Sequence, residues 1–385
     1  MRLAAWEWRK LTALPALWVF VGLSLAFNVL LIAGLSHADR AFFNETSAAA
    51  EVLGQQVDGA FLRGLSQMPP TENRALLLQS VTGLEDIFED YDAGDLAGFY
   101  TGVVEGSPLA EEWMTWKYGL LAGRVEHLAQ TDAALELYAG PATHGSHQFL
   151  FGTLFRAVLC ESVMLAMLGT LYLVGYEGLH QTEGMVCTAR TGRGLWRAKV
   201  LAAVPASVVL YALLAACTLL PYFLLYDYSG IWSASVSSQF NYLTDMLVIR
   251  PFLTWGDFTV AQYLAAALAL GAVVTAIFSL LASVCGTLVW NTYLAALVLG
   301  VVCFGEIGMV SVLGELGWWT AYLVLTFQPA MIWLTCSGWF TELGLNAVLP
   351  WQETIAAGLN LLLWGGGAAL ALRRFYREDV AEWRC

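Results

Sequence analysis

Long apolar segments limit how this chain can fold. Seven runs of mostly hydrophobic residues alternate with polar stretches. Most of the runs reach the roughly 20 residues that an α-helix needs to cross about 30 Å of hydrocarbon. Hydrophobic residues fill 58% of the 385 positions and charged residues only 13%, a composition that indicates a polytopic membrane protein. The runs cover residues 12–35, 149–176, 200–226, 258–285, 291–313, 318–336 and 353–372.

The distribution of basic residues predicts which side of the membrane each connection occupies. Arg and Lys gather in the cytoplasmic loops of membrane proteins, whereas residues 227–257 hold only Arg250 and residues 314–352 hold none. We therefore expect a multi-pass protein of the cell membrane with both termini in the cytoplasm. The number of crossings is then even, so one run does not span. The basic segments contain Arg2, Arg9 and Lys10; Arg190, Arg193, Arg197 and Lys199; and Arg373, Arg374, Arg377 and Arg384.

The run that does not span is expected at 318–336. Pro329 within it removes a helix hydrogen bond and clashes with the preceding turn, and Gln328 beside it is polar. The fold class is therefore an all-α polytopic membrane protein. It has six transmembrane helices, a helical extracytoplasmic insertion between spans 1 and 2, and an outer re-entrant segment between spans 5 and 6. The remaining parts are an amphipathic cytoplasmic or interfacial segment (1–11), an outer loop (227–257) and a cytoplasmic tail (373–385).

Residues 36–148 form the acidic insertion. They contain 17 acidic side chains against five basic ones, nearly all of the net charge of −13. Ser107 followed by Pro108 predicts an N-cap and the first residue of a helix, so a small helical domain is expected. The acidic run 85–92 is interpreted as a solvated face. A patch that collects a cationic substrate or a metal is the alternative.

Most catalytic motifs are missing from the sequence. None of its lysines follows a glycine as in a phosphate-binding loop, and no H-E-x-x-H pair exists. We expect no catalytic, cofactor-binding or metal-binding residue. An intramembrane aspartyl protease is a remote alternative, because Asp227 and Asp257 flank the outer loop and two carboxylates sharing a proton are an acid-base pair. The first glycine of the G-x-G-D pattern of such a protease, three positions before the aspartate, is Thr254 here.

The connection 177–199 has a distinctive charge pattern. Glu177 ends the second span, Glu183 and Gly184 follow, and basic residues lead into the third span. A plain anchor to anionic headgroups, at about 1 kcal/mol per basic residue, is one reading. It leaves the upstream acidic residues and the long polar gap without a role. A helix docked in the cleft of a soluble partner uses both, because charged ends fix its register and orientation.

This stretch resembles the cytoplasmic connection of ABC-2 type transporter permeases. In that family an acidic residue and a glycine follow the second helix, and a short coupling helix then leads to basic residues before the third. The N-terminal segment, the large outer insertion and the basic tail agree with the family's plan. The resemblance implies that seven residues couple to an ATPase and that four are interfacial. They are Glu177, Glu183, Gly184, Arg190, Arg193, Arg197 and Lys199, and then Trp6, Trp8, Arg9 and Lys10.

The same resemblance implies the partners. This chain is expected to be the permease subunit of an ATP-driven exporter of an amphipathic or peptide-like substrate. A separate ABC ATPase subunit binds ATP and Mg, so this chain is not itself an enzyme. A second permease chain, identical or different, and the lipid bilayer are further partners, and no nucleic acid is expected. The acidic insertion favours a cationic amphipathic peptide as the substrate.

Charged residues inside the spans are candidates for the substrate pathway. Charges are expensive in lipid and usually face the interior of a bundle, which singles out Arg156, Glu161 and Glu306. Pairing between helices is as good an interpretation as substrate contact. A different class of function also remains open, namely a membrane sensor or immunity protein that binds cationic peptides through the acidic domain.

Overall fold

The structure is a computed structural model that describes residues 2–138, 140–188, 192, 194–242, 252–289 and 291–377. It is 79% helical and has no strands in the part of the chain that is described. Six helices are long and apolar enough to cross a membrane, so the chain is an all-α, multi-pass membrane protein. They are α2 (Pro15–Ala33), the continuous segment Ala142–Leu179 that ends in α10 (Phe155–Leu179), α12 (Gly194–Leu225), α13 (Val260–Leu288), α14 (Thr292–Glu315) and α17 (Gln352–Arg377).

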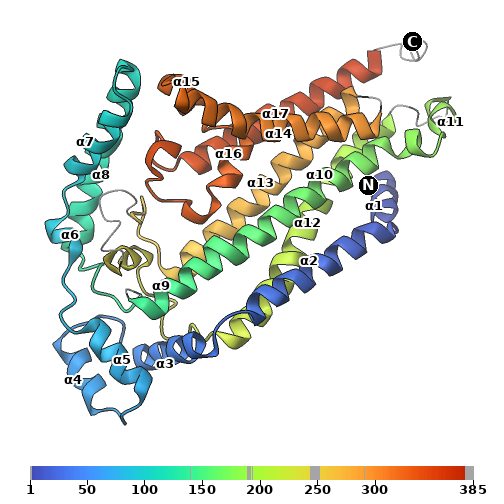
Figure 1. Ribbon diagram of the computed structural model, residues 1–385. Helices are drawn as coiled ribbons and strands as arrows, with labels where there is room; N and C mark the ends of the chain where they lie inside the picture. The colour runs from blue at the N-terminus through green and yellow to red at the C-terminus, as the bar shows by residue number, and fades with distance from the viewer. Residues whose placement is uncertain are drawn as a thin grey trace.

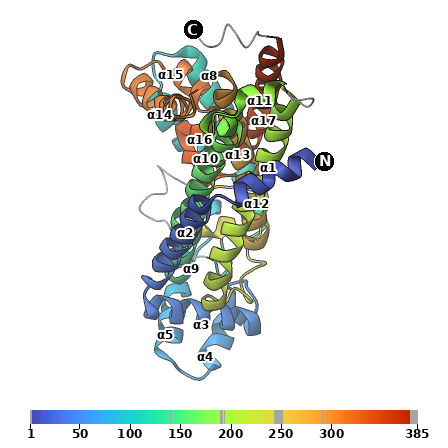
Figure 2. The ribbon, with the colours of Figure 1, turned by 90° about the vertical axis from the view of Figure 1, so that its right-hand side faces the viewer.

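The long helices pack into one inclined bundle (Figure 1). Helix α10 lies at its centre, where buried Thr170 and Ser279 of α13 share a hydrogen bond of 2.8 Å. The N-terminus, the C-terminal end of α17 and the short helix α11 (Glu183–Thr188) lie at one end, which we call the termini end. The helices of residues 37–81 lie at the opposite, domain end (Figures 1 and 2), and the helices of residues 87–130 stand beside the bundle (Figure 1).

Helix α1 (Arg2–Thr12) meets α2 at a sharp turn (Figure 2). Pro15 is the first residue of α2, where its missing N–H costs no helix hydrogen bond. Trp18 closes the turn by donating from Nε1 to the carbonyl oxygen of Thr12 at 2.7 Å. The apolar run 12–35 therefore lies almost entirely in α2, and only its first residue, Thr12, belongs to α1.

The inserted region has two small cores. The first packs α3 (His37–Leu53), α4 (Gly59–Gln67) and α5 (Glu72–Val81) together. The second belongs to α6 (Ile87–Asp90), α7 (Ala93–Val103) and α8 (Pro108–Gln130), and later parts of the chain complete it. The residues from those later parts are Phe240, Leu253, Leu323 and Val348. One of the two cores of residues 36–148 is thus shared with distant segments of the chain.

Acidic side chains begin several of these helices. Asp86 and Asp92 lie in the acidic run and accept hydrogen bonds from the backbone N–H groups of Phe88 and Gly94, at 2.8 and 2.7 Å. Two members of that run are therefore N-caps. The predicted cap at Ser107 is wrong in one respect. Helix α8 does begin at Pro108, but the Ser107 hydroxyl makes no cap bond and instead pairs with Thr320 at 2.9 Å.

The segment 318–336 is broken into short helices. Helices α15 (Trp319–Leu325) and α16 (Pro329–Leu334) are each too short to span, and Pro329 begins the second one. The N–H of Ala330, in the first turn of α16, donates to Glu306 of α14 at 3.3 Å. The other short elements are α9 (Pro141–His147), the π-helix η1 (Gln148–Leu154) and the 3₁₀ helices η2 (Val236–Tyr242), η4 (Cys336–Gly338) and η5 (Gly344–Asn346).

Candidate functional site

A buried ion pair joins the end of α10 to the start of α12. Glu177 and Lys199 form a salt bridge and are 2% and 0% exposed. The Nζ atom of Lys199 also donates to the carbonyl oxygens of Leu173 (2.6 Å) and Val174 (3.2 Å). A buried ammonium is costly unless a carboxylate and further acceptors surround it, and both are present here. The pair therefore fixes the two spans to each other where the chain turns between them.

Helix α1 adds two more charges to this pair. Lys10 donates to Glu177 at 2.9 Å and to Glu7 at 2.7 Å, and its Nζ lies 4.5 Å from the centre of the Tyr176 ring. Glu7 is 1% exposed. Two carboxylates and two ammonium groups thus form a neutral set from three helices, which we call the four-charge cluster. It consists of Glu7, Lys10, Glu177 and Lys199.

This arrangement changes the role expected for two of the predicted coupling residues. Glu177 and Lys199 face the interior, so neither side chain lies on the surface that a partner would meet. Arg197 and Gly184 are exposed. Glu183 is the first residue of α11, but its side chain lies outside the described part of the structure, as do Arg190 and Arg193 entirely.

Some of the predicted interfacial residues are exposed and others face the bundle. Trp6 is 62% exposed and stacks under the exposed guanidinium of Arg9 at 5.2 Å. Trp8 is half-buried and packs on the main hydrophobic core. Lys10 belongs to the four-charge cluster. One face of α1 therefore contacts the bundle, and the other presents an aromatic and basic surface of the kind found at membrane interfaces.

Helix α11 lies at the extreme termini end, between α10 and α12 (Figure 1). Its Met185 is 70% exposed. Val186 and Cys187, on the opposite side, pack against a small core at the bases of α10, α12 and α17. Within that core the rings of Trp196 and Phe375 are 4.6 Å apart. The inner side of α11 is therefore in direct contact with a core that three long helices share.

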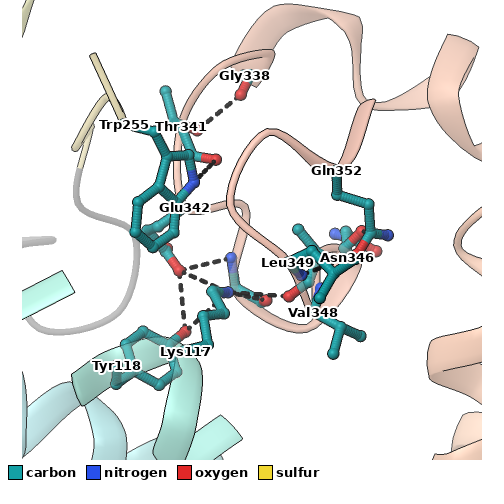
Figure 3. Close-up of polar contacts among 12 residues, drawn as sticks. Lys117, Tyr118, Trp255, Gly338, Thr341, Glu342, Asn346, Val348, Leu349 and Gln352 are labelled. Atoms are coloured by element: carbon teal, nitrogen blue, oxygen red, sulfur yellow. Dashed lines mark hydrogen bonds and ion pairs between the residues drawn. The ribbon is translucent and has the colours of Figure 1, made fainter. Parts of the chain in front are cut away.

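A second buried ion pair ties the inserted region to the loop before α17 (Figure 3). Lys117 of α8 is fully buried, and its Nζ lies 3.2 Å from Glu342 Oε2. It donates to the carbonyl oxygens of Gly344 (2.7 Å) and Ala347 (3.0 Å). Burial lowers the pKa of Lys117 although the charge of Glu342 opposes the shift. Tyr118 also donates to Glu342, at 2.9 Å, so α8 holds this loop through two neighbouring side chains.

The charged residues predicted within the spans have partners on other elements. Arg156 donates to Ser337 Oγ at 2.8 Å. Glu161 accepts from Asn28 of α2 at 2.9 Å, and Asn28 also donates to Thr218 of α12 at 3.0 Å. Glu306 holds the start of α16, as described above. Of the three, only Arg156 lines the large cavity of about 650 Å³ at the domain end, which lies between α7, α10, α15 and residues 334–346.

Asp227 and Asp257 have separate partners. Asp227 accepts from the N–H of Ser229 at 2.9 Å. Asp257 pairs with Arg124 at 2.6 Å and His127 at 3.0 Å. Burial raises the pKa of Asp257, but the hydrogen bonds and charges of Arg124 and His127 outweigh it and hold the pKa below its usual value. The pair sharing one proton that an aspartyl protease needs is not formed by these residues.

Sequence reasoning missed Glu7, Asn28, Lys117 and Glu342. One feature of the sequence points to one of them, Lys117. The chain has only three lysines among its 18 basic residues, and each of the three pairs with a glutamate. A lysine in this chain is therefore a candidate for an ion pair with a glutamate.

Metal-binding side chains and similarity to known proteins are two further sources of evidence about function. Among the described residues, no group of three His, Cys, Asp or Glu side chains is placed to hold a metal ion. Comparisons with protein-family models, curated proteins and solved structures find no match. Function is therefore inferred from the residues themselves and from their arrangement.

Proposed function

We propose that this chain is the permease subunit of an ABC-2 type transporter and works with a separate ATPase subunit. The observation that carries the proposal is helix α11. It is short, exposed on one side at Met185, and packed on the other against the bases of three spans. A coupling helix needs this combination, because it has to contact a soluble partner and transmit motion to the bundle.

The four-charge cluster supports the proposal mechanically. Glu177 ends the span before α11 and Lys199 begins the span after it, and their ion pair makes the two helices one unit. Lys10 ties α1 to the same unit. When ATP binding brings two ATPase subunits together, a push on α11 would move α1, α10 and α12 as a rigid body. ATP and Mg belong to the partner, and this chain supplies the path.

Under this proposal, the distribution of basic and acidic residues gives the orientation of the chain in the membrane. The described basic residues Arg9, Arg197, Arg373, Arg374 and Arg377 belong to α1, α12 and α17, which meet at the termini end, whereas the acidic inserted region lies at the opposite end. The termini end would then be cytoplasmic, and the broken segment α15–α16 would be an outer re-entrant hairpin. A second permease chain would complete the pathway.

Two exposed positions test the orientation directly. Val52 of α3 is 71% exposed and Met185 of α11 is 70% exposed, so each accepts a cysteine without disturbing a core. In a cysteine-free background, a membrane-impermeant thiol reagent on intact cells should label Val52→Cys. Met185→Cys should label only after lysis. The reverse pattern would refute the orientation.

Disulfide or maleimide cross-linking tests whether α11 contacts an ATPase subunit. Met185→Cys in the tagged chain should cross-link to an ATPase subunit in native membranes. Adding Arg197→Glu should weaken this link by reversing an exposed charge beside α11. Arg63→Glu, an exposed change on α4 at the domain end, is the matched control and should leave the link unchanged. A chain whose α11 links to no ATPase, or links to one equally with Arg197→Glu, would count against the proposal.

A further inference from the structure

The large cavity at the domain end has one wall from the inserted region and one from the bundle. Phe99 and Tyr100 of α7 face Arg156 of α10 across it, and residues 334–346 form its floor. Its volume of about 650 Å³ is in the range of sites that hold a small organic ligand. The Lys117–Glu342 pair and the bonds of Lys117 to Gly344 and Ala347 hold the loop that forms this floor (Figure 3).

The cavity lies at the depth of lipid headgroups if the four-charge cluster marks the opposite membrane surface. Arg156 and Glu177 are separated by about 20 positions of the same helix, which is about 30 Å at 1.5 Å per residue. The hydrocarbon core of a bilayer is about as thick. When the buried charges at Glu177 lie at one boundary, the guanidinium of Arg156 therefore lies at the other.

Charge within the cavity favours an anion. Among the described residues that line it, Arg156 is the one cation, and its hydrogen bond goes to the neutral hydroxyl of Ser337. The lining carboxylate, Glu342, is 2% exposed. Its Oε2 accepts from Tyr118 and from the N–H of Gly344 (2.8 Å) and pairs with Lys117. Glu342 is thus already neutralised, and the charge left to a ligand is positive, opposite to the acidic surface of the inserted region.

One part of the lining is apolar and exposed. Phe99, Val103 and Leu334 line the cavity and are 42%, 36% and 47% exposed. Exposed apolar side chains beside a cation at headgroup depth match a molecule with an anionic head and an apolar chain. Arg is suited to the head, because its planar fork binds phosphate and carboxylate bidentately.

We infer that this cavity binds an amphipathic anion, with a phosphate or carboxylate head at Arg156 and an apolar chain along Phe99, Val103 and Leu334. As the substrate class of the transporter, the inference rests on the proposed function. The binding itself does not require the ATPase. The inferred ligand is an anion, whereas the acidic composition of residues 36–148 favours a cationic peptide.

Lipid binding to the purified full chain tests the inference without the ATPase. In native mass spectrometry from detergent, dioleoylphosphatidylglycerol should bind at one saturable site, and the zwitterionic dioleoylphosphatidylcholine should bind more weakly. Arg156→Gln should weaken the anionic lipid about tenfold, the size of a lost charge-assisted hydrogen bond. Arg63→Gln, with the same change of charge on exposed α4, should bind like the wild type.

A second variant and a second ligand complete the test. Val103→Asp places a carboxylate on the apolar wall at an already exposed position and should also weaken the lipid. Inorganic phosphate that competes at millimolar concentration would identify a soluble phosphate compound as the ligand, whereas no competition identifies a lipid. Equal binding by wild type and Arg156→Gln, or a preference for a cationic peptide, would overturn the inference. Either result would leave the cross-link at α11, and thus the proposed function, untouched.

Discussion

Replacement of Glu177 by Gln should destabilise the protein more than any other single exchange of an acidic residue for its amide. The substitution keeps the shape of the side chain but removes the carboxylate that both Lys10 and Lys199 use. Lys10 retains its ion pair with Glu7, whereas Lys199 loses its ion pair and keeps its hydrogen bonds to two carbonyl oxygens of α10. Removing one partner of a buried ion pair costs about 3–5 kcal/mol, and the remaining carbonyl bonds place the expected loss near the lower limit, about 3 kcal/mol.

The double variant Glu177→Gln with Lys199→Met separates an ion pair from simple loss of packing. Methionine fills a similar volume and removes the buried charge, so most of the lost stability should return. Reversible unfolding in mixed detergent and SDS, followed by tryptophan fluorescence, measures the differences. Glu315→Gln, at an exposed end of α14, is the control and should change stability by less than about 0.5 kcal/mol. A loss of that small size for Glu177→Gln, or no recovery in the double variant, would refute the four-charge cluster as a structural element.

Three further outcomes are expected at the domain end. Lys117→Met should leave Glu342 without its cation and raise hydrogen exchange in residues 336–351, and unchanged exchange there would show that the pair does not hold the loop. Gly344→Ala should loosen the same loop, because Gly344 has φ +58° and an added Cβ lies 2.9 Å from Tyr100 Cζ; wild-type exchange rates would contradict this. Asp257→Asn should cost less than about 1 kcal/mol because the carboxylate is largely exposed. Since the folded pKa of Asp257 is below the unfolded one, its contribution is present above about pH 4 and is lost as the pH falls through the folded pKa. Unfolding curves of the variant should therefore depend less on pH below 4 than those of the wild type.

The spans were predictable because lipid imposes a length and a composition on each of them. The break in 318–336 was predictable for a related reason, since Pro329 removes one N–H and forces a helix to begin again. In the structure it does so with Glu306 from another helix accepting from the next N–H. That Glu306 supplies this acceptor depends on the packing of α14 against α16, which local sequence does not encode.

The ion pairs between helices were harder to predict from the sequence than the spans. Glu177 and Lys199 are close in sequence, and both were predicted as coupling residues. The charge pattern is the same whether these side chains face a soluble partner or pair with each other, so it does not distinguish the two roles. Lys10 reaches Glu177 from the far end of the chain, and Lys117 reaches Glu342 over an even longer separation. Such contacts follow from the arrangement of helices. The same holds for Ser107, which has a capping position by sequence but is drawn to Thr320 by the packing of α8 against α15.

ATP hydrolysis that purifies with the chain tests the central claim most directly. The tagged chain, extracted from its own membranes in mild detergent, should bring an ATPase activity with it, although its sequence has no phosphate-binding loop. Met185→Glu places a charge on the exposed side of α11 and should reduce this activity at least about tenfold, as expected when an apolar contact at the centre of an interface is lost. The yield and stability of the chain should not change. A wild-type chain that carries no ATP hydrolysis, or a Met185→Glu chain that carries as much as the wild type, would contradict the assignment of α11 as the coupling helix of a transporter.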